Sequence, residues 1–345
     1  MTLQSATKPE SLPFALLRAG FPFLATLGMR RVTTYPMDLV FGDNDELYVL
    51  CRADAPGLGG SNIRRINWND DDLDTIGGGR LLWPVQMIRD SAGILYVSDE
   101  GSHQIIKLNQ DGSEAGEWGE KGSDEGQLNR PSGIAFDLHE DLIVVDTLNH
   151  RVQKFNKDGK YLSGFGSKGS GPGEFDMPWG ITVAGNGDIL VADWHNDRVQ
   201  RFTSDGEFIM AFGSSGTGDG EFSRPAGVEV DHHGDIYVVD RGNNRVQQFS
   251  PAGKYFDKFV GDAILSKSGE TYVRANPSVL RNREMANTEQ QKRLRGPASV
   301  RFDNDGHMYI PDFGSHRIQV YNKLAYPLTP EEIAPVPNHP TLYTV

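Results

Sequence analysis

Hydrophobic and polar residues alternate along much of this chain in short runs with a period of two. Residues 180–212 show the pattern most clearly, with four runs rich in β-branched and aromatic residues: GITV, DILVAD, RVQRF and EFIMAF. Turn sequences such as Asn-Gly and Ser-Asp-Gly separate these runs. Alternation of this kind between turn signals predicts four short β-strands in succession.

The same four-strand unit recurs at a regular distance along the chain. Three closely similar copies, each 47 residues after the previous one, open at Pro131, Pro178 and Pro225, and weaker copies open at Pro36, Pro84 and Pro297. A fixed period of this length indicates a repeat architecture, and four short strands per unit are typical of a propeller blade. We therefore predict an all-β fold, a six-bladed β-propeller of four-stranded antiparallel blades, as one domain over residues 1–345 with a C-terminal tail at 322–345.

The sixth unit lacks a convincing fourth strand before the proline-rich tail begins. Near the N-terminus, however, residues 23–28 (FLATLG) align with residues 208–213 (FIMAFG), the fourth run of the unit that Pro178 opens. An open ring would leave unpaired strand edges. We expect the N-terminal strand to complete the last blade and close the ring.

Two motifs within the units resemble NHL repeats. The stretches Asp146–Phe155, Asp193–Phe202 and Asp240–Phe249 follow the pattern D-x-x-N-x-R-[VI]-Q-x-[FY], and connections of the type FG-x-x-G-x-G-x-G-x-F-x-x-P join the units. The resemblance covers residues 23–321, closely in three units and more loosely in the other three. It implies a six-bladed propeller in which each unit's opening proline and the aspartate of its VxD motif lie on the same face.

Residues after these two landmarks should line the mouth of the central channel. Two residues after the opening proline, units three to five have glycine, whereas the other units have Asp38, Gln86 and Ser299. In unit one, Cys51 also replaces the VxD aspartate. End units that drift to accommodate ring closure are one interpretation. A ligand site on a surface loop is the other. Its candidate binding residues are Asp38, Cys51, Arg52, Gln86 and Glu100, with Trp179, Trp194 and His195 opposite them and Arg241 beside them.

The two tryptophans of unit four, Trp179 and Trp194, offer flat surfaces on which a ligand could stack. Plugging the channel is the alternative role for such a side chain. The sequence leaves both open.

A long insertion separates units five and six, where the spacing between opening prolines grows from 47 to 72 residues. Residues 262–296 form it, and residues 282–295 are rich in helix-forming residues before the stop signal Gly296-Pro297. Seven basic against four acidic residues give the segment a local charge of +3. A lid or docking arm over the channel is one interpretation, and a tolerated surface insertion is the other.

The overall charge limits the classes of partner. A net charge of −13 disfavours non-specific attraction to nucleic acid or to anionic membranes. Cys51 is the only cysteine, so no intrachain disulfide supports an oxidising compartment. The N-terminal sequence lacks the features of a signal peptide, and no transmembrane run is present, so we expect a cytoplasmic protein.

No catalytic or metal motif stands out, and we predict no cofactor. Amidating lyases that resemble NHL propellers carry zinc-binding histidines directly after the opening proline, where this chain has none. His103, His150 and His316 occupy equivalent places in different units, so we expect structural roles. Asp38, Gln86 and Glu100 could contribute to a channel-bound divalent cation such as calcium, although three ligands are too few alone. Cys51 would be a nucleophile only if His195 or Arg52 lowered its pKa.

Three functions remain compatible with these observations. The first is a non-catalytic propeller that presents its loop face to a protein partner or a small-molecule ligand. The second is a hydrolase or lyase that acts on a small polar substrate in the channel under the 262–296 insertion. The third, binding of single-stranded RNA as in some NHL domains, would use arginines and stacking side chains, and the net charge makes it the least favoured.

Overall fold

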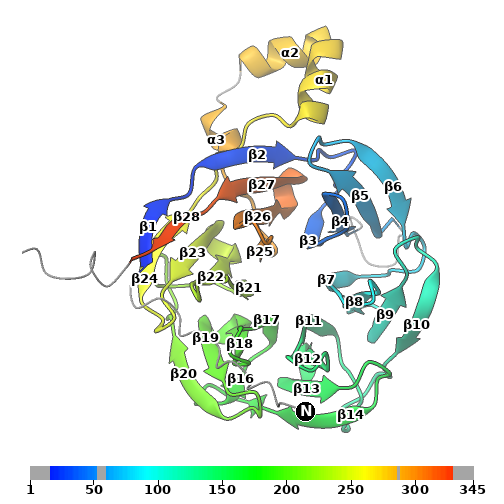
Figure 1. Ribbon diagram of the computed structural model, residues 1–345, viewed down its shortest axis with the longest axis vertical. Coiled ribbons are helices and arrows are strands. Elements are labelled where there is room, and N and C mark those ends of the chain that lie inside the picture. The colour runs from blue at the N-terminus through cyan, green and yellow to red at the C-terminus, as the bar shows by residue number, and fades with distance from the viewer. Residues whose placement is uncertain (1–15, 53–59, 286–287, 329–345) are drawn as a thin grey trace, which may run out of the picture.

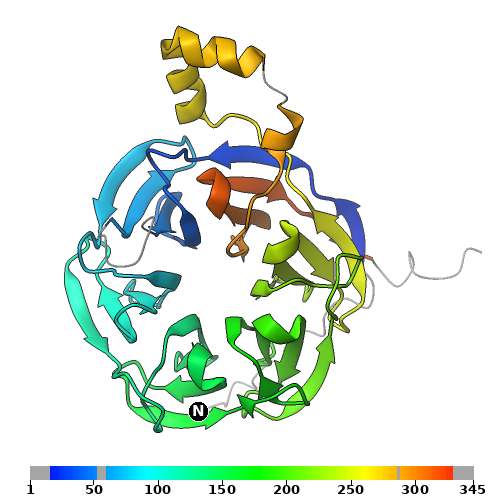
Figure 2. The same cartoon turned by 180° about the vertical axis from the view of Figure 1, so that it is seen from behind.

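The structure is a computed structural model that describes residues 16–52, 60–285 and 288–328. Six four-stranded antiparallel sheets surround a central axis as the blades of a propeller (Figure 1). Each blade runs from an inner strand at the axis to an outer strand at the rim, and the view from behind shows the same ring (Figure 2). The predicted fold class is confirmed.

The first three blades follow the chain in order. Blade 1 contains β3 (Pro36–Phe41), β4 (Glu46–Cys51), β5 (Asn62–Asn67) and β6 (Asp72–Ile76). Blade 2 contains β7 (Pro84–Arg89), β8 (Leu95–Asp99), β9 (Gln104–Leu108) and β10 (Glu114–Trp118). Blade 3 contains β11 (Pro131–Phe136), β12 (Leu142–Asp146), β13 (Arg151–Phe155) and β14 (Tyr161–Phe165).

The other three blades complete the ring. Blade 4 contains β17 (Pro178–Val183), β18 (Ile189–Asp193), β19 (Arg198–Phe202) and β20 (Phe208–Phe212), after a short parallel pair of β15 (Ser167–Lys168) and β16 (Glu174–Phe175). Blade 5 contains β21 (Pro225–Val230), β22 (Ile236–Asp240), β23 (Arg245–Phe249) and β24 (Tyr255–Phe259). Blade 6 contains β25 (Arg301–Phe302), β26 (His307–Asp312), β27 (Arg317–Asn322) and, from the N-terminus, β2 (Phe23–Leu27).

The N-terminal strand β2 closes the ring as expected. It pairs antiparallel with β27, in a register that places Phe23 opposite Tyr321 and Leu27 opposite Ile318. A second ribbon was not predicted: β1 (Leu16–Gly20) pairs with β28 (Leu324–Pro327), so part of the expected C-terminal tail is a strand. Residues 329–345 of that tail lie outside the described part of the chain.

The VxD aspartates have the same bonding role in several units. Asp240 is fully buried and accepts hydrogen bonds from the Ser223 amide (2.8 Å), Asn243 Nδ2 (2.9 Å), Arg245 Nε (2.7 Å) and Gln247 Nε2 (3.2 Å). Equivalent arginines bind their aspartates at 2.8–2.9 Å in three other blades: Arg151, Arg198 and Arg317. The recurring Asp and Arg residues therefore brace blades 3 to 6 through charge-assisted bonds.

The recurring histidines also have structural roles, as expected. His103, His150 and His316 adopt left-handed backbone conformations, and each Nδ1 accepts a hydrogen bond at 3.0 Å from a backbone amide that precedes the next blade. Asp197 and Asn244 accept the same bond in blades 4 and 5. Burial lowers the pKa of His103 and His150, which favours the neutral ring needed to accept this bond.

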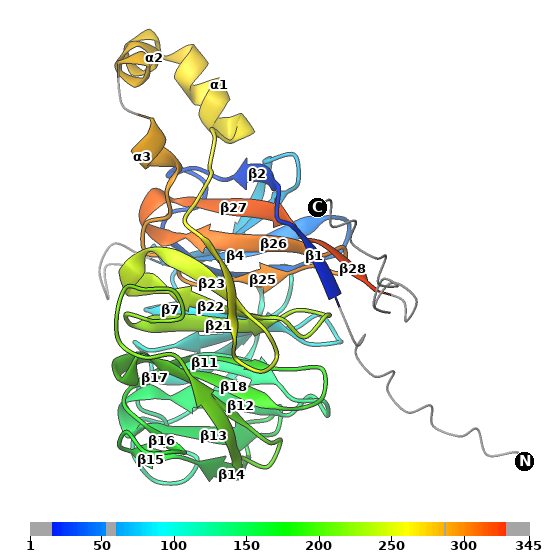
Figure 3. The ribbon, with the colours of Figure 1, turned by 90° about the vertical axis from the view of Figure 1, so that its left-hand side faces the viewer.

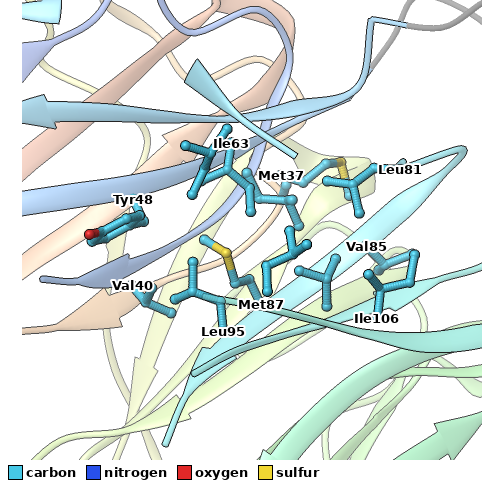
Figure 4. Close-up of a cluster of buried hydrophobic side chains, with 14 residues drawn as sticks. Met37, Val40, Tyr48, Ile63, Leu81, Val85, Met87, Leu95 and Ile106 are labelled. Atoms are coloured by element: carbon cyan, nitrogen blue, oxygen red, sulfur yellow. The ribbon is translucent and has the colours of Figure 1, made fainter. Parts of the chain in front are cut away.

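Hydrophobic cores fill the spaces between neighbouring blades. Between blades 1 and 2, for example, Met37, Tyr48 and Ile63 pack against Met87 and Ile106 (Figure 4). Each sheet is covered on both faces by its neighbours, and the second strands are accordingly buried along nearly their whole length.

The insertion forms a helical arm, which we define as α1 (Lys267–Ala275), α2 (Pro277–Glu284) and α3 (Glu289–Lys292). Helices begin earlier than the predicted range of 282–295, because the Ser266 hydroxyl caps α1 by accepting the Gly269 amide (3.1 Å). The arm projects outward beyond β2 (Figures 1 and 3). The prediction of a lid or arm over the channel is therefore wrong about its position.

Contacts with blade 1 explain this outward course. The Ser268 amide donates to Asp70 Oδ2 (2.8 Å), and Lys267 Nζ lies 3.2 Å from Asp71 Oδ1, both in the turn between β5 and β6. Arg31 also lies over the ring of Tyr272 at 5.0 Å.

Across the described ranges, no helix is long and apolar enough to cross a membrane.

Candidate functional site

Strand register places the landmark residues of each blade at the same end of the channel. The opening proline of an inner strand pairs with the last residue of the second strand, as in Pro36 with Cys51 and Pro131 with Asp146. We call this end of the propeller the loop face. All nine predicted site residues lie near it, but they have very different surroundings.

Asp38, a candidate binding residue, belongs to an ion network across the channel. Its carboxylate is fully buried, accepts the Met87 amide (3.0 Å), and binds Arg301 through Nε (2.8 Å) and Nη2 (2.5 Å). Arg301 Nη1 binds Glu229 at 2.7 Å, and Glu229 accepts the Thr182 hydroxyl at 2.8 Å. Although burial disfavours its charge, these two carboxylates raise the pKa of the Arg301 guanidinium. The network joins the inner strands of blades 1, 6, 5 and 4.

Sequence reasoning missed Arg301 and Glu229, although a signal was present. Both residues come four positions after an opening proline, where blades 1, 2 and 3 carry Val40, Ile88 and Ala135. Charged side chains at an otherwise apolar inner-strand position point into the channel and need a partner there.

Gln86 and Trp179 complete the lining of the channel at this level. Gln86 Oε1 accepts the Ile134 amide (3.2 Å) and so links blade 2 to blade 3. Trp179 packs against the buried clusters of Met37 and Ala226, which lie on other blades, and stacks on Trp194 with ring centroids 4.8 Å apart. Only about 20 Å³ of free space remains beside Trp179.

Cys51 is enclosed in a hydrophobic cluster between blades 6 and 1, with 1% of its surface exposed. Burial raises the pKa of its thiol to about 12. His195 lies on blade 4, is largely exposed, and faces the Asp176 carboxylate at 3.6 Å. The surroundings of Cys51 therefore favour the thiol over the thiolate that a nucleophile needs.

Arg52 and Arg241 are two arginines at the loop face that lie on aromatic rings. The Arg52 guanidinium lies over Trp83 (4.5 Å) and donates from Nε to the Pro84 carbonyl (2.8 Å), and its side chain is 6% exposed. Its Nη2 is buried and has no hydrogen-bond partner among the described residues. Arg241 lies over Phe313 (4.8 Å), which in turn packs on Tyr35.

Neither arginine has a carboxylate within ion-pair distance in the described part of the chain. Burial lowers the pKa of Arg52 to about 10, the nearby charge of Glu100 opposes this shift, and Arg241 adds to it. Burial alone lowers the pKa of Arg241. Glu100, which is 3% exposed, is bound instead to Arg130 at 2.8 Å. We call Arg52, Trp83, Arg241 and Phe313 the arginine–aromatic cluster.

The sequence pointed to half of this cluster. Arg52 and Arg241 were candidates, whereas Trp83 and Phe313 were not. Blades 1 and 2 have an aromatic residue directly before the opening proline, namely Tyr35 and Trp83. The other four blades have Arg, Met, Arg and Gly at the same position. That difference was the available signal.

Each of the candidate cation ligands already has a partner within the protein. Asp38 and Glu100 each bind an arginine, and Gln86 binds a backbone amide. Within the described ranges, Asp303, Asp305 and His307 form the group closest to metal-ligand spacing. The Asp303 carboxylate there accepts the Asp305 and His307 amides, as in an ordinary turn.

Comparisons with known proteins agree with this architecture. The model of a family described as a 6-bladed beta-propeller matches residues 122–186 and 180–262. A protein of unknown function from Bacteroides thetaiotaomicron is similar in structure, with a TM-score of 0.60 and 20% identity over 88% of this chain and 72% of that one. No curated protein matches the sequence.

Two further solved structures have assigned functions. Virginiamycin B lyase from Staphylococcus aureus has a TM-score of 0.56 and 15% identity over 88% of this chain and 100% of that one. An auxiliary nutrient binding protein from Bacteroides ovatus has a TM-score of 0.57 and 11% identity over 90% of this chain and 76% of that one. At such low identity these similarities show a shared fold alone. The fold and the comparisons define the protein as a six-bladed β-propeller.

Proposed function

We propose that this protein is a binding propeller whose loop face holds a small organic anion with a flat apolar part. The observation that supports this most is the arginine–aromatic cluster. Burying a guanidinium away from water costs several kcal/mol unless an opposite charge accompanies it. Arg52 is almost fully buried and Arg241 is partly buried, and no described carboxylate binds either one. An anionic ligand would supply the missing charge.

The geometry of the cluster suits such a ligand. A ring under a guanidinium fixes its plane and leaves its N–H edge free for a carboxylate or phosphate oxygen. Trp194, which stacks on Trp179 and is partly exposed, offers flat apolar surface on blade 4. Carboxylates and phosphates share the chemistry that this cluster recognises, so both are included in the test.

We further propose that the chain is an NHL-type propeller in the cytoplasm. The Asp–Arg brace of the D-x-x-N-x-R motif, present with the same geometry in four blades, supports the first part. The single, buried cysteine supports the second.

The proposal can be tested with a set of matched small probes. Phenylacetate and phenyl phosphate carry an anion on an aromatic ring, and phenylacetamide is a neutral counterpart of the first. We expect both anions to change the tryptophan fluorescence of the protein and to release heat on titration, and the amide to do neither. The variants Arg52→Gln and Arg241→Gln should each weaken anion binding about tenfold or more, the size of one charge-assisted contact.

The control is Arg281→Gln, which removes an exposed arginine from the helical arm. It should bind the anions like the wild-type protein. Equal binding of the amide, unchanged binding by both site variants, or no binding of either anion would refute the proposal.

An enzyme, either a hydrolase or a lyase, is the alternative, and the fold shared with virginiamycin B lyase is compatible with it. The loop face offers little general-base capacity, because Glu100 is bound to Arg130 and His195 is exposed beside Asp176. We therefore favour binding. Turnover of a bound ester or lactone that is lost in Glu100→Gln would instead support catalysis. A steep salt dependence of affinity for single-stranded RNA would support the third function.

A further inference from the structure

The widest part of the channel lies at the end opposite the loop face. A cavity of about 570 Å³ opens there, between the last residues of the inner strands and the turns that follow them. We call it the lower cavity. Its lining includes Phe41, Arg89, Phe136, Glu229, Arg301 and Phe302. This volume is within the usual range for small-molecule sites.

The floor of the lower cavity carries a surplus negative charge. Arg301 is held on one side by both oxygens of Asp38 and on the other by Glu229 at 2.7 Å. One guanidinium therefore faces two carboxylates. Glu229 is the one that borders the lower cavity, and its side chain is 15% exposed. Its Oε1 accepts the Thr182 hydroxyl and the Val230 amide, whereas Oε2 accepts only Arg301 among the described residues and can accept a second positive charge.

The surroundings of the cavity add to this surplus. Arg89, the other basic residue of the lining, binds Asp43. Two acidic residues of the lining bind cations from outside it: Asp90 binds Lys157, and Asp231 binds Lys323. Asp303 borders the cavity as well and is bonded to His307 and Tyr309. The lining itself carries two basic groups, Arg89 and Arg301, against four carboxylates, Asp90, Glu229, Asp231 and Asp303, a net charge of −2 with a neutral histidine.

Aromatic rings form part of the walls. Phe41, Phe136 and Phe302 come from blades 1, 3 and 6 and are each only partly buried. A tyrosine of a neighbouring second strand supports each ring, with centroid distances of 5.0, 5.2 and 4.6 Å. Lys157 Nζ already lies 5.7 Å from the Phe136 ring. Partly exposed phenyl faces in an acidic cavity attract organic cations more than hydrated metal ions.

We propose that the lower cavity is a second binding site, which takes a small organic cation of the alkylammonium or quaternary ammonium class. Glu229 pairs with the ammonium group, and the phenylalanine walls cover its alkyl substituents. This site is separate from the arginine–aromatic cluster, because Trp179 and the Asp38–Arg301 network fill the channel between them. The two sites also select opposite charges, so each serves as the control for the other.

Choline and its uncharged carbon isostere dimethylbutanol are suitable probes, because they differ only in the charged centre. Titration calorimetry and ligand-observed NMR on the full chain should show binding of choline and none of dimethylbutanol. Glu229→Gln should weaken choline binding about tenfold or more. The glutamine can still accept the Thr182 hydroxyl, and Arg301 keeps Asp38, so the fold should persist. Phe136→Leu should also weaken choline binding, since it removes a ring face.

Two controls separate this site from general effects. Glu207→Gln removes an exposed carboxylate outside the cavity lining and should bind choline like the wild-type protein. Arg241→Gln should likewise leave choline binding unchanged even if it abolishes anion binding at the loop face. No binding of choline to the wild-type protein, equal binding of dimethylbutanol, or full binding by a Glu229→Gln variant with an unchanged circular dichroism spectrum would each overturn the proposal.

Discussion

At the scale of single residues, the same side-chain type serves the scaffold in one place and lines a potential site in another. Arg245 is almost fully buried but bonded to Asp240 and two backbone carbonyls, so its charge is satisfied within the blade. Arg52 is equally buried, yet its Nη2 lacks a described partner. What distinguishes the two is the set of partners, and the residue type alone does not reveal it.

This difference gives a prediction for the scaffold. Asp240→Asn replaces an acceptor of four hydrogen bonds by an amide that cannot accept them all, and it leaves Arg245 buried without its counter-charge. We expect the free energy of unfolding to fall by about 3–5 kcal/mol, as for other broken buried pairs. Denaturant titration followed by circular dichroism measures it.

Asp205→Asn is the matched control, since Asp205 is exposed in a turn of blade 4. A loss for Asp240→Asn no larger than for this control would mean that the brace contributes little to stability.

At the scale of elements, the helical arm shows how a few local contacts direct a long insertion. The arm leaves blade 5 and returns close to its starting point, since the Ala263 amide donates to the Lys292 carbonyl at 3.2 Å. Between these residues it is attached to the turn of blade 1 by Ser268 and Lys267. An element tied to the rim at both ends and at its first helix cannot at the same time cover the channel.

Deletion of the arm tests this view. Joining Ala263 to Lys292 through two glycines removes residues 264–291 and keeps the hydrogen-bonded base. Because the lost contacts with the propeller are exposed or only partly buried, we expect the free energy of unfolding to fall by no more than about 2 kcal/mol. Binding of phenyl phosphate and of choline should be unchanged by calorimetry. Weaker binding of either probe would show that the arm contributes to a site after all.

At the scale of the whole molecule, both ends of the described chain are fastened to blade 5 as well as to each other. Asp235 is fully buried and binds Arg18 of β1 at Nε (2.8 Å) and Lys323, next to β28, at 2.8 Å. Lys323 also binds Asp231. This ion network supplements the β2–β27 pairing, so ring closure depends on both backbone and side-chain bonds.

The network predicts a specific pH dependence. Burial alone would raise the pKa of Asp235, but the bonds from Arg18 and Lys323 outweigh it and hold that pKa below its usual value. The stabilisation is therefore complete above the unfolded-state pKa of about 4 and disappears as the pH falls through the lower folded-state pKa. Asp235→Asn should lower the free energy of unfolding at neutral pH by about 3 kcal/mol.

Urea titrations at neutral and at strongly acidic pH measure this difference. The gap between the wild-type protein and Asp235→Asn should narrow in acid, where the wild-type carboxyl is protonated. Asp158→Asn, an exposed turn substitution, should show no such narrowing. A gap that stays constant with pH would contradict the role of the ion network.

The sequence by itself determined the blade, the number of blades and the closure by the N-terminal strand. These features depend on alternation with a period of two, on turns at fixed distances and on the Asp–Arg brace, all of which act within one unit and are repeated in the next. Such local rules can be read along the chain, as Asp146, Asp193 and Asp240 illustrate.

Only the tertiary structure decided which side chains meet across the channel, where the free space lies and where the arm points. Asp38 and Arg301 are 263 positions apart in the chain and become partners because blades 1 and 6 are neighbours in the ring. Trp179 fills the upper channel because side chains from other blades surround it, and this leaves the lower end as the wide cavity. Contacts between blades depend on three-dimensional packing, which no periodicity within a single blade encodes.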